Sequence, residues 1–478
     1  MADTAKVMSL SKADILELTA RQVARAIAER SLRAVDYAEM LLARIEATAA
    51  LGAFVAIDPD AVQAAARNAD RKVAAGDPLG PLHGVPLAVK DNIDAAGLPA
   101  AAGTPALAAN RPRADAAVLA PLRAAGAILL GKTNMHELAA GVTTNNAHFG
   151  TAHNPYDMTR VPGGSSGGTA IAVAARLAPV ALGTDTGASN RLPAAFCGVV
   201  GFRPTTGRWP QSGMILNSPT RDTAGPMARD VADCALLDAL VTGDAATPEP
   251  ALENLRLGVP RAAFWDDLDP RVASACEDAL ARLRDAGVTL IEMNLPGIHE
   301  LTAQASTVIA MYEHPLAMEA YLAASGSGLA AAEVFSAIAS PDVRHFVDAC
   351  HGQFTEMQYR AALKDTRPRL QALYREAYAR GRLDALIFPT APIPAPRIGL
   401  EEDEIDHRGQ RHQTLLLAIR NTNPGSVAGV PGISLPAGVV DGLPIGIELD
   451  GRSGDDRRLL AIAQLIERVL PSTPPPAL

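Results

Sequence analysis

Residues 84–90 decide the fold class, and their sequence is Gly84-Val-Pro-Leu-Ala-Val-Lys90. An apolar run of this length that ends on a charge predicts a buried strand. Similar short runs at 54–57 and 127–130 alternate with helical patterns at 60–75 and 115–125. This alternation predicts an α/β protein with a mixed β-sheet core surrounded by helices.

Apolar runs and helical spacing of apolar residues also predict the remaining strands and helices. Further strands are expected at 385–388, 433–435 and 445–449, and helices at 13–50 (two), 134–140, 168–177 and 455–469. No linker divides the chain, so we expect a single large domain. Its N-terminal helical region, residues 1–60, packs on the main domain, residues 61–470, which carries a mainly helical insertion or cap at about 270–380. The tail, 471–478, is expected to be disordered.

Composition limits the function. The 478 residues include 43 basic and 52 acidic ones, a net charge of -9, whereas a nucleic-acid binder needs a basic surface to neutralise phosphates. The hydrophobic fraction of 48% is enough for a large core and excludes wholesale disorder. The four cysteines are widely spaced, which is typical of reduced thiols in a cytoplasmic protein.

Two segments bear on membrane association. Residues 1–10 have no apolar stretch long enough for a signal peptide. The charge-free run 421–440 is long enough to cross a bilayer, but its three prolines and several glycines predict loop and strand. We therefore expect a cytoplasmic protein with no membrane and no nucleic-acid partner. The oligomeric state stays open, a homo-oligomer included.

The segment Gly126-Ala-Ile-Leu-Leu-Gly-Lys-Thr133 fits the pattern of a phosphate-binding loop. Such a loop must follow a strand and present free amides to the anion. Here the interior residues predict a buried strand, and the residues before Gly126 are helical. We expect a core strand with a solvated Lys132 rather than a nucleotide site.

The segment Gly163-Gly-Ser-Ser-Gly167 fits the pattern of the nucleophile elbow of α/β-hydrolases. An elbow follows a buried strand, but residues 157–162 are loop-like and end in Pro162. The partner histidine and aspartate would have to lie downstream, and no histidine there has a distinctive setting. A Ser-His-Asp esterase centred on Ser165 remains an alternative hypothesis.

A third interpretation joins Lys90 to two glycine-rich segments. Ser165 follows Lys90 by 75 residues, and Ser189 lies 24 further on in Gly183-Thr-Asp-Thr-Gly-Ala-Ser-Asn-Arg-Leu-Pro193. A glycine-rich turn exposes backbone N–H groups beside its serine, and burial lowers the pKa of a lysine toward that of a usable base. These are the parts that hydrolysis of an acyl bond requires. A surface lysine and an ordinary loop would have the same spacing.

At these residues the chain resembles the amidase signature family, and its pattern is most similar to the subgroup of indoleacetamide and mandelamide hydrolases. The resemblance covers essentially the whole chain in order. The motifs that carry it are 84–91, 131–137, 149–155, 163–168, 183–193, 198–205, 222–226, 388–390, 429–436 and 443–446. It implies one α/β domain and hydrolysis of carboxylic amides through a Ser–cis-Ser–Lys triad and an acyl-enzyme.

By position, the resemblance implies that Ser189 is the nucleophile, Ser165 the bridging serine and Lys90 the base, which works in its neutral form. The family holds the bridging serine after a cis peptide bond, here Gly164–Ser165. The resemblance also implies an oxyanion hole formed by the backbone N–H groups of Thr186, Gly187, Ala188 and Ser189. Residues that fix this loop would be Ser166, Asp185 and Arg191, and substrate contacts would come from Gly164 and Asn190.

Two departures from the common family pattern lie beside the nucleophile. Ala188 stands where many members have glycine, and Asn190 replaces a β-branched apolar residue. If position 188 required positive φ, alanine would be strained there, so we expect an ordinary φ. The Gly187-Ala-Ser189 variant favours aryl-substituted amides, with anilides, carbamates or esters as further substrates.

Other chemistries find less support. A glutaminase-type subunit of an amidotransferase complex is the main alternative, although such subunits usually carry Gln where this chain has Leu192. Histidines and carboxylates show no metal-binding spacing, so we expect no metal, no cofactor and ten histidines that are dispensable for the chemical step. The acidic run Glu401-Glu-Asp-Glu404 is interpreted as a solvated loop near the substrate entrance.

Overall fold

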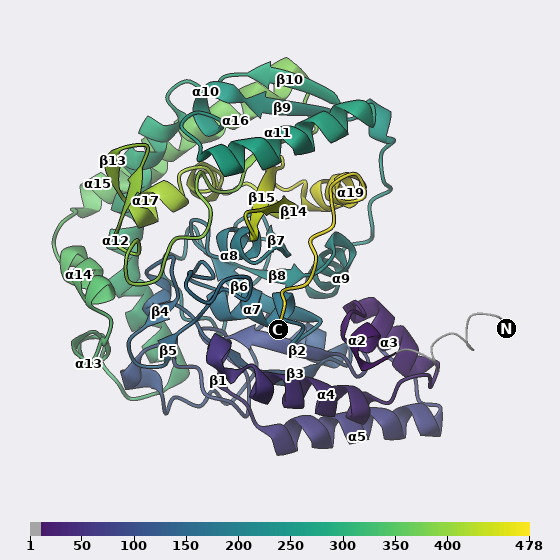
Figure 1. Ribbon diagram of the computed structural model, residues 1–478. Coiled ribbons are helices and arrows are strands. Elements are labelled where there is room, and N and C mark those ends of the chain that lie inside the picture. Colours follow the sequence, from purple (N-terminus) through teal and green to yellow (C-terminus); the bar gives the residue numbers. More distant parts are fainter. Residues whose placement is uncertain (1–10) are drawn as a thin grey trace.

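A computed structural model describes residues 11–478 and contains one mixed sheet of eleven strands with helices around it (Figure 1). The strand order is β1-β3-β2-β6-β8-β7-β14-β15-β11-β9-β10. These strands are β1 Phe54–Ala56, β2 Pro86–Lys90, β3 Ile128–Thr133, β6 Val180–Asp185, β7 Val200–Arg203, β8 Thr223–Ala228, β9 Arg256–Pro260, β10 Thr289–Met293, β11 Ala385–Pro389, β14 Gly432–Val440 and β15 Leu443–Asp450. The expected α/β class and mixed sheet are confirmed.

The sheet mixes parallel and antiparallel neighbours. β2 runs parallel to both β3 and β6, and β9 runs parallel to both β10 and β11, whereas the central strands β8, β7, β14 and β15 pair antiparallel with their neighbours. Because parallel strands end at the same edge of a sheet, the C-terminal ends of β2 and β6 bring Lys90 and Asp185 to one place.

Helices cover both ends of the sheet. In Figure 1, the N-terminal helices lie at the end that holds β1, β3 and β2, and α10, α11 and α16 lie at the end that holds β9 and β10. The long helices are α3 Ala20–Ala28, α4 Ala34–Ala47, α5 Pro59–Ala75, α9 Val231–Thr242, α11 Pro270–Asp285, α12 Ile298–Ser325, α14 Pro341–Cys350, α16 Arg367–Gly381 and α19 Asp456–Glu467. The shorter ones are α2 Lys12–Leu16, α6 Ala120–Ala124, α7 Gly167–Ala174, α8 Arg191–Phe196, α10 Arg261–Phe264, α13 Ala331–Ser336, α15 Glu356–Ala361, α17 Thr414–Ala418 and α18 Asn423–Ala428.

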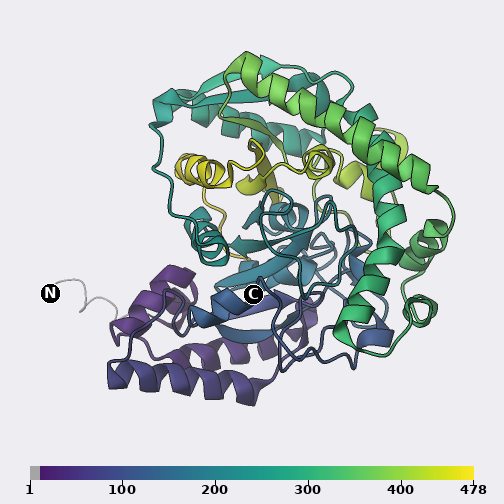
Figure 2. The same ribbon diagram turned by 180° about the vertical axis from the view of Figure 1, so that it is seen from behind.

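The region 270–380 forms a mainly helical layer that curves around one side of the molecule, in green in Figure 2. α12 contacts α14, α16 and α18. This region also contributes β10 to the edge of the sheet, which its helical pattern did not predict. The domain boundaries expected from the sequence stay predictions, as does the disorder of 471–478. That tail has neither helix nor strand, and Tyr156 Oη donates a hydrogen bond of 2.8 Å to Pro474 O.

Two local expectations were wrong. Residues 13–50 form three helices, not two, because Ser11 and Thr19 each begin a helix with a capping box. The helix expected at 134–140 is only a short 3-10 turn at Glu137–Ala139, where Leu138 and Ala139 have positive φ. Residues 1–10 lie outside the described part of the chain.

α7 is buried along its whole length and follows directly from the glycine-rich segment 163–168. Gly168 allows this packing, because a Cβ there would lie 2.4 Å from Ala53 O and 2.5 Å from Asn134 O. The serines before α7 are therefore held against the core rather than on a free loop. Within residues 11–478, no helix combines the length and the apolar character needed to span a bilayer.

Candidate active site

Lys90 ends β2 and has no exposed surface. Its Nζ lies 2.7 Å from Ser165 Oγ and 2.7 Å from Thr184 Oγ1, and Asn92 Nδ2 donates to the same threonine hydroxyl at 3.3 Å. The amine is therefore surrounded by neutral hydroxyl groups rather than by a carboxylate partner. This environment favours the uncharged amine.

Burial lowers the pKa of Lys90 to about 7, although the carboxylates of Asp222 and Asp185 partly oppose the shift. A substantial fraction of the amine is therefore uncharged at neutral pH. Asp222 is also buried, which raises its pKa to about 6, and it accepts hydrogen bonds from Asn217 N at 2.7 Å and Ser218 N at 2.9 Å. The sequence indicated the motif that begins at Asp222, but it predicted no role for this residue.

The segment 163–167, which contains the predicted bridging serine Ser165, is held by several hydrogen bonds. The Gly164–Ser165 peptide bond is cis, as the resemblance implied. Ser165 O accepts a hydrogen bond from His136 N at 3.1 Å. Thr144 Oγ1 donates to Gly163 O at 2.8 Å and accepts from Gly167 N at 3.1 Å. The segment on both sides of Ser165 is thus bonded to the neighbouring loop 136–144.

The segment 186–190, which contains the predicted nucleophile Ser189, lies between β6 and α8 and contacts the segment 163–167. Ser189 O accepts a hydrogen bond from Ser166 N at 3.2 Å. Ser166 Oγ donates to Thr184 O at 3.1 Å and accepts from Thr184 N at 3.3 Å, so Ser166 ties the two segments together. Ser189 is 6% exposed, while Ser165 and Lys90 are fully buried. The structure therefore joins Lys90 to Ser165 directly and holds the loop of Ser189 against that pair.

A buried ion-pair network packs against the segment that contains Ser189. Arg191 Nε and Nη2 donate to the two oxygens of Asp185 at 3.0 and 3.1 Å, and Arg203 Nη1 donates to Asp185 Oδ1 at 3.2 Å. Burial opposes ionisation of Asp185, but the two arginines hold its pKa below the usual range. Arg191 Nη1 also pairs with Glu448 at 2.6 Å. Sequence reasoning named Asp185 and Arg191 but missed Arg203 and Glu448, although Arg203 is the only charge in the motif 198–205.

The candidate oxyanion donors lie on the same loop. Arg191 Nη2 donates to Gly187 O at 3.2 Å, which fixes that carbonyl on the side of the ion-pair network. Within residues 11–478, no hydrogen bond is formed by the backbone N–H groups of Gly187, Ala188 and Ser189. Ala188 is not among the residues with positive φ, so its Cβ requires no strain there. Three adjacent N–H groups are therefore free to bind an anion.

Asn190 is fully buried and its side chain faces the sheet. Asn190 Nδ2 donates to Phe202 O at 2.8 Å and Pro226 O at 3.1 Å. A Cβ on Gly183 would lie 2.3 Å from Asn190 Oδ1, so this glycine makes room for the amide. The side chain is therefore held against the carbonyl groups of two strands.

A cavity of about 950 Å³ borders the loop at 136–147, whose His136 N donates a hydrogen bond to Ser165 O. Its wall includes Val142 and Thr143, and a Cβ on Gly164 would lie 2.7 Å from Val142 C and 2.9 Å from Thr143 N. Met311 of α12 and Phe346 of α14 add apolar surface. The cavity therefore lies between the loop at 140–147, which packs against Gly164, and the helical layer, and its lining residues do not include Lys90, Ser165 or Ser189.

The rim of this cavity is acidic. Asp342, Glu402, Asp403 and Glu404 line it, and no lysine or arginine does. Glu402 Oε2 accepts a hydrogen bond from Asn145 Nδ2 at 3.0 Å, which ties the acidic run to the loop beside the catalytic segments. Three residues of the acidic run thus line this cavity, and its position near a substrate entrance stays a prediction.

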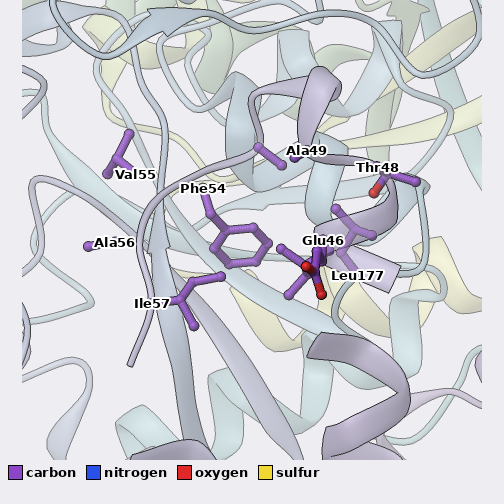
Figure 3. Close-up of a pocket in the computed structure, with 10 residues that line it drawn as sticks. Glu46, Thr48, Ala49, Phe54, Val55, Ala56, Ile57 and Leu177 are labelled. Atoms are coloured by element: carbon purple, nitrogen blue, oxygen red, sulfur yellow. The ribbon is translucent and has the colours of Figure 1, made fainter. Parts of the chain in front are cut away.

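A smaller pocket of about 300 Å³ lies elsewhere, where the end of α4 meets β1 and Leu177 (Figure 3). Phe54, Ile57 and Ile45 give it an apolar wall. It contains none of the residues around Lys90. We assign no chemistry to it.

The expectation that Lys132 is solvated was wrong. Lys132 is fully buried in β3, and its Nζ donates to Ile93 O and, at 3.4 Å, to Asp91 O. Burial lowers its pKa to about 8, against the opposing effect of Asp91 and Asp94. Residues 128–133 form a strand, so the segment has the structure that was expected in place of a phosphate-binding loop.

Histidines take no direct part in this arrangement. The backbone N–H of His136 bonds to Ser165 O, but its ring bonds to Asp342 Oδ2 at 2.8 Å and Thr143 Oγ1 at 3.3 Å. Across residues 11–478, no histidine ring is hydrogen-bonded to Ser165 or Ser189, and no group of three or more His, Cys, Asp or Glu residues could hold a metal ion. The titratable side chain bonded to Ser165 Oγ within the described residues is thus that of Lys90.

Comparison with known proteins agrees with this geometry. The model of the Amidase family matches residues 36–460. The chain belongs to the amidase family. This amidase is 44% identical over 448 residues to an indoleacetamide hydrolase of Agrobacterium vitis, covering 92% of this chain and 95% of that protein. It is 41% identical over 479 residues to a mandelamide hydrolase of Pseudomonas putida, covering 96% and 93%.

The amidase also shares its fold with a solved relative. The structure of a peptide amidase from Stenotrophomonas maltophilia superposes with a TM-score of 0.79 and 30% identity, covering 96% of this chain and 98% of that one. The resemblance inferred from the motifs is confirmed, and the amidase is a hydrolase that acts on amide C–N bonds.

Proposed function

We propose that this amidase hydrolyses small, uncharged, aryl-substituted carboxylic amides by a Ser189–Ser165–Lys90 relay and an acyl-enzyme. The observation that carries the proposal is the 2.7 Å contact between Lys90 Nζ and Ser165 Oγ in a fully buried site. An amine with a pKa of about 7 is matched to proton transfer near neutral pH.

In the acylation step, Ser189 Oγ attacks the amide carbonyl carbon and gives its proton to Ser165 Oγ. Ser165 passes its own proton to the neutral Lys90 amine. The carbonyl oxygen becomes an oxyanion, which the N–H groups of Thr186, Gly187, Ala188 and Ser189 stabilise. Donors of this kind contribute about 3 kcal/mol each in other enzymes.

The same groups return the protons. Lys90, now an ammonium, protonates the leaving nitrogen through Ser165, the C–N bond breaks, and ammonia or an amine departs. Water then attacks the acyl-enzyme, losing its proton to the relay, and Ser189 is released with the carboxylic acid. Ser166, Asp185 and Arg191 hold the loops in place, as their hydrogen bonds support. The buried side chain of Asn190 supports a packing role rather than substrate contact.

The cavity supports the choice of substrate. Its volume and its apolar surface from Val142, Met311 and Phe346 suit an aryl group. Its four carboxylates, without a lysine or arginine, disfavour an anionic amide such as one with a free carboxylate.

The decisive experiment measures ammonia or amine release from indoleacetamide, mandelamide, acetanilide, an aryl carbamate and glutamine. Wild-type protein is expected to cleave at least one uncharged aryl amide without a partner chain, and Ser189→Ala should abolish turnover. Ser336→Ala, which removes an exposed hydroxyl on α13, is the matched control and should keep full activity. A chelator should leave the rate unchanged.

Undiminished turnover by Ser189→Ala would refute the proposed nucleophile. Cleavage of glutamine alone, or activity only with a co-purifying partner, would favour the amidotransferase alternative instead. Inactivation by a single histidine substitution would favour a Ser-His-Asp esterase.

A further inference from the structure

Arg221 is a buried arginine beside the nucleophile loop that has no acidic partner in contact. It immediately precedes Asp222 and β8 and is 3% exposed. Its Nη1 donates to Ser306 O and Oγ, both at 3.0 Å, and its Nη2 donates to Asn423 Oδ1 at 2.6 Å. Within residues 11–478 no carboxylate forms a salt bridge with it, and its buried Nε has no hydrogen-bond partner.

The guanidinium lies next to Gly187. A Cβ on Gly187 would be 3.5 Å from Arg221 Nη2 and 3.3 Å from Asn423 Oδ1. A second arginine, Arg191, bonds to the carbonyl oxygen of the same residue at 3.2 Å. Two cationic side chains therefore lie close to Gly187, and its unbonded N–H belongs to the candidate oxyanion hole.

The two arginines differ in how their charges are matched. Arg191 is compensated by Asp185 and Glu448 in direct ion pairs. Arg221 relies on hydrogen bonds to neutral groups. Burial together with Arg367 and Arg203 lowers its pKa to about 10, although the more distant carboxylates of Asp222 and Glu313 partly oppose the shift. It still carries its charge at neutral pH. A buried charge without a direct counterion is unfavourable in the resting protein, and it becomes favourable when a negative charge forms nearby.

We propose that Arg221 is a positioning residue of this amidase, which orients Gly187 and stabilises the negative charge that develops on the oxyanion at the nucleophile loop. The proposal rests on the function proposed above. It adds a cation to an oxyanion hole otherwise made of backbone N–H groups, and it acts through Gly187 and the local electrostatic potential rather than by touching the substrate.

A purely structural role is the competing explanation, because Arg221 also connects α12, through Ser306, with α18, through Asn423. The two roles differ in what they stabilise. A brace supports the folded loop in every state. A charge that acts on the oxyanion favours the anionic transition state over the neutral substrate.

The test compares Arg221→Gln, which is neutral and still able to form hydrogen bonds, with Arg221→Lys, which keeps the charge. We measure kcat and KM on the neutral aryl amide that wild type cleaves best. We also measure Kd for two ligands of the same aryl shape: a boronic acid, whose adduct with serine is a tetrahedral anion, and a neutral alcohol. Ser306→Ala is the control that removes the hydroxyl bonded to Arg221 and Asn423 and leaves the charge.

Arg221→Gln should lower kcat about 30-fold and weaken boronate binding by about the same factor, with KM and alcohol binding changed about 2-fold or less. Arg221→Lys should recover most of kcat, and Ser306→Ala should stay close to wild type. Equal losses of affinity for the boronate and the alcohol, or a kcat for Arg221→Gln within about 3-fold of wild type, would overturn the proposal.

The experiment distinguishes an error in the proposed function from an error in the proposed role of Arg221. If wild type cleaves amides and Arg221→Gln is as active, the proposed function stands and the role of Arg221 falls. If wild type cleaves no amide and binds no boronate at Ser189, the proposed function falls and takes this inference with it. If Arg221→Gln does not fold, the ratio of boronate to alcohol affinity in Arg221→Lys relative to Ser306→Ala decides: a preserved ratio supports the role of charge, and a ratio lowered tenfold opposes it.

Discussion

Two buried lysines on neighbouring strands show how the same side chain serves different purposes. Lys90 ends β2 and Lys132 lies in β3, and the two parallel strands pair Val89 with Lys132 and Lys90 with Thr133. Both lysines are fully buried, and burial lowers the pKa of each, to about 7 and about 8. Desolvation alone therefore does not distinguish a base from a structural residue.

The two lysines differ in the atoms that surround their side-chain nitrogens. Lys90 Nζ meets the hydroxyls of Ser165 and Thr184, which can exchange protons with it. Lys132 Nζ meets the carbonyl oxygens of Ile93 and Asp91, which only accept hydrogen bonds. The contacts of Lys132 hold the turn after β2 in place, whereas those of Lys90 are the ones that the proposed proton relay requires.

The largest effect is expected from replacing each lysine by methionine. Lys90→Met should lower kcat/KM about 10⁴-fold, because the relay then has no base, while the melting temperature stays near that of wild type. Lys132→Met should lower the free energy of unfolding by about 3 kcal/mol, because it leaves two buried carbonyl groups and the nearby Asp91 carboxylate without their cation. Rates of ammonia release and urea denaturation measure the two quantities.

The opposite pattern would break this comparison. If folded Lys132→Met lost activity as severely as Lys90→Met, then both lysines would belong to the chemical machinery. If Lys90→Met kept activity, the relay would need another base.

The pH dependence of activity is expected to show the pKa of Lys90. Burial lowers that pKa to about 7, so below pH 7 the amine is mostly protonated and kcat/KM should fall about tenfold per pH unit. Above pH 7 the neutral form dominates and the rate should level off. Asp222 is a carboxylate that raises the pKa of Lys90, so Asp222→Asn should move the inflection to lower pH.

A plot of log kcat/KM against pH for the two proteins measures this shift. Asp94→Asn is the control, because Asp94 acts on Lys132 and not on Lys90. An inflection that moves upward in Asp222→Asn, or that moves equally in both variants, would contradict the assignment of the titrating group to Lys90.

A structural feature can be predicted from this sequence when the contacts that determine it lie close together in the chain. The strands at 86–90 and 128–133 follow from apolar runs, and the capping boxes at Ser11 and Thr19 were local signals that went unused. The surroundings of Lys132 could not be derived, because its acceptors lie in the turn at 91–93, about 40 residues away in the chain. An apolar strand that contains a lysine is the same pattern whether that lysine is solvated or bonded internally.

The same limit applies to the candidate site. The motifs indicate Lys90, Ser165 and Ser189, and the structure brings the first two into contact and the loop of the third beside them. The partners that set the charge balance are Arg203, Asp222 and Glu448. They approach Asp185, Lys90 and Arg191, respectively, only after β7, β8 and β15 join the sheet. Likewise, the direction of the Asn190 side chain depends on carbonyls of two other strands.

The smallest effect is expected at the cavity rim, where matched and unmatched charges can again be compared. Glu404 pairs with Arg411 at 2.7 Å, whereas the Asp403 carboxylate forms no hydrogen bond or ion pair within residues 11–478. An unmatched carboxylate repels an anionic amide more than a matched one does. The effect is modest, because Asp403 is exposed and salt screens its charge.

Asp403→Asn should therefore raise kcat/KM for a carboxylate-bearing aryl amide, relative to its neutral methyl ester, by about 3-fold at low ionic strength. Glu404→Gln removes the same formal charge but also frees Arg411, so it is the matched variant with which the first is compared. Glu319→Gln, an exposed change on α12 away from the cavity lining, should leave the ratio unchanged. Equal ratios in Asp403→Asn and Glu319→Gln would mean that the rim does not select substrates by charge. A gain for Asp403→Asn that disappears in high salt would show that its unpaired carboxylate acts on the substrate through the local field.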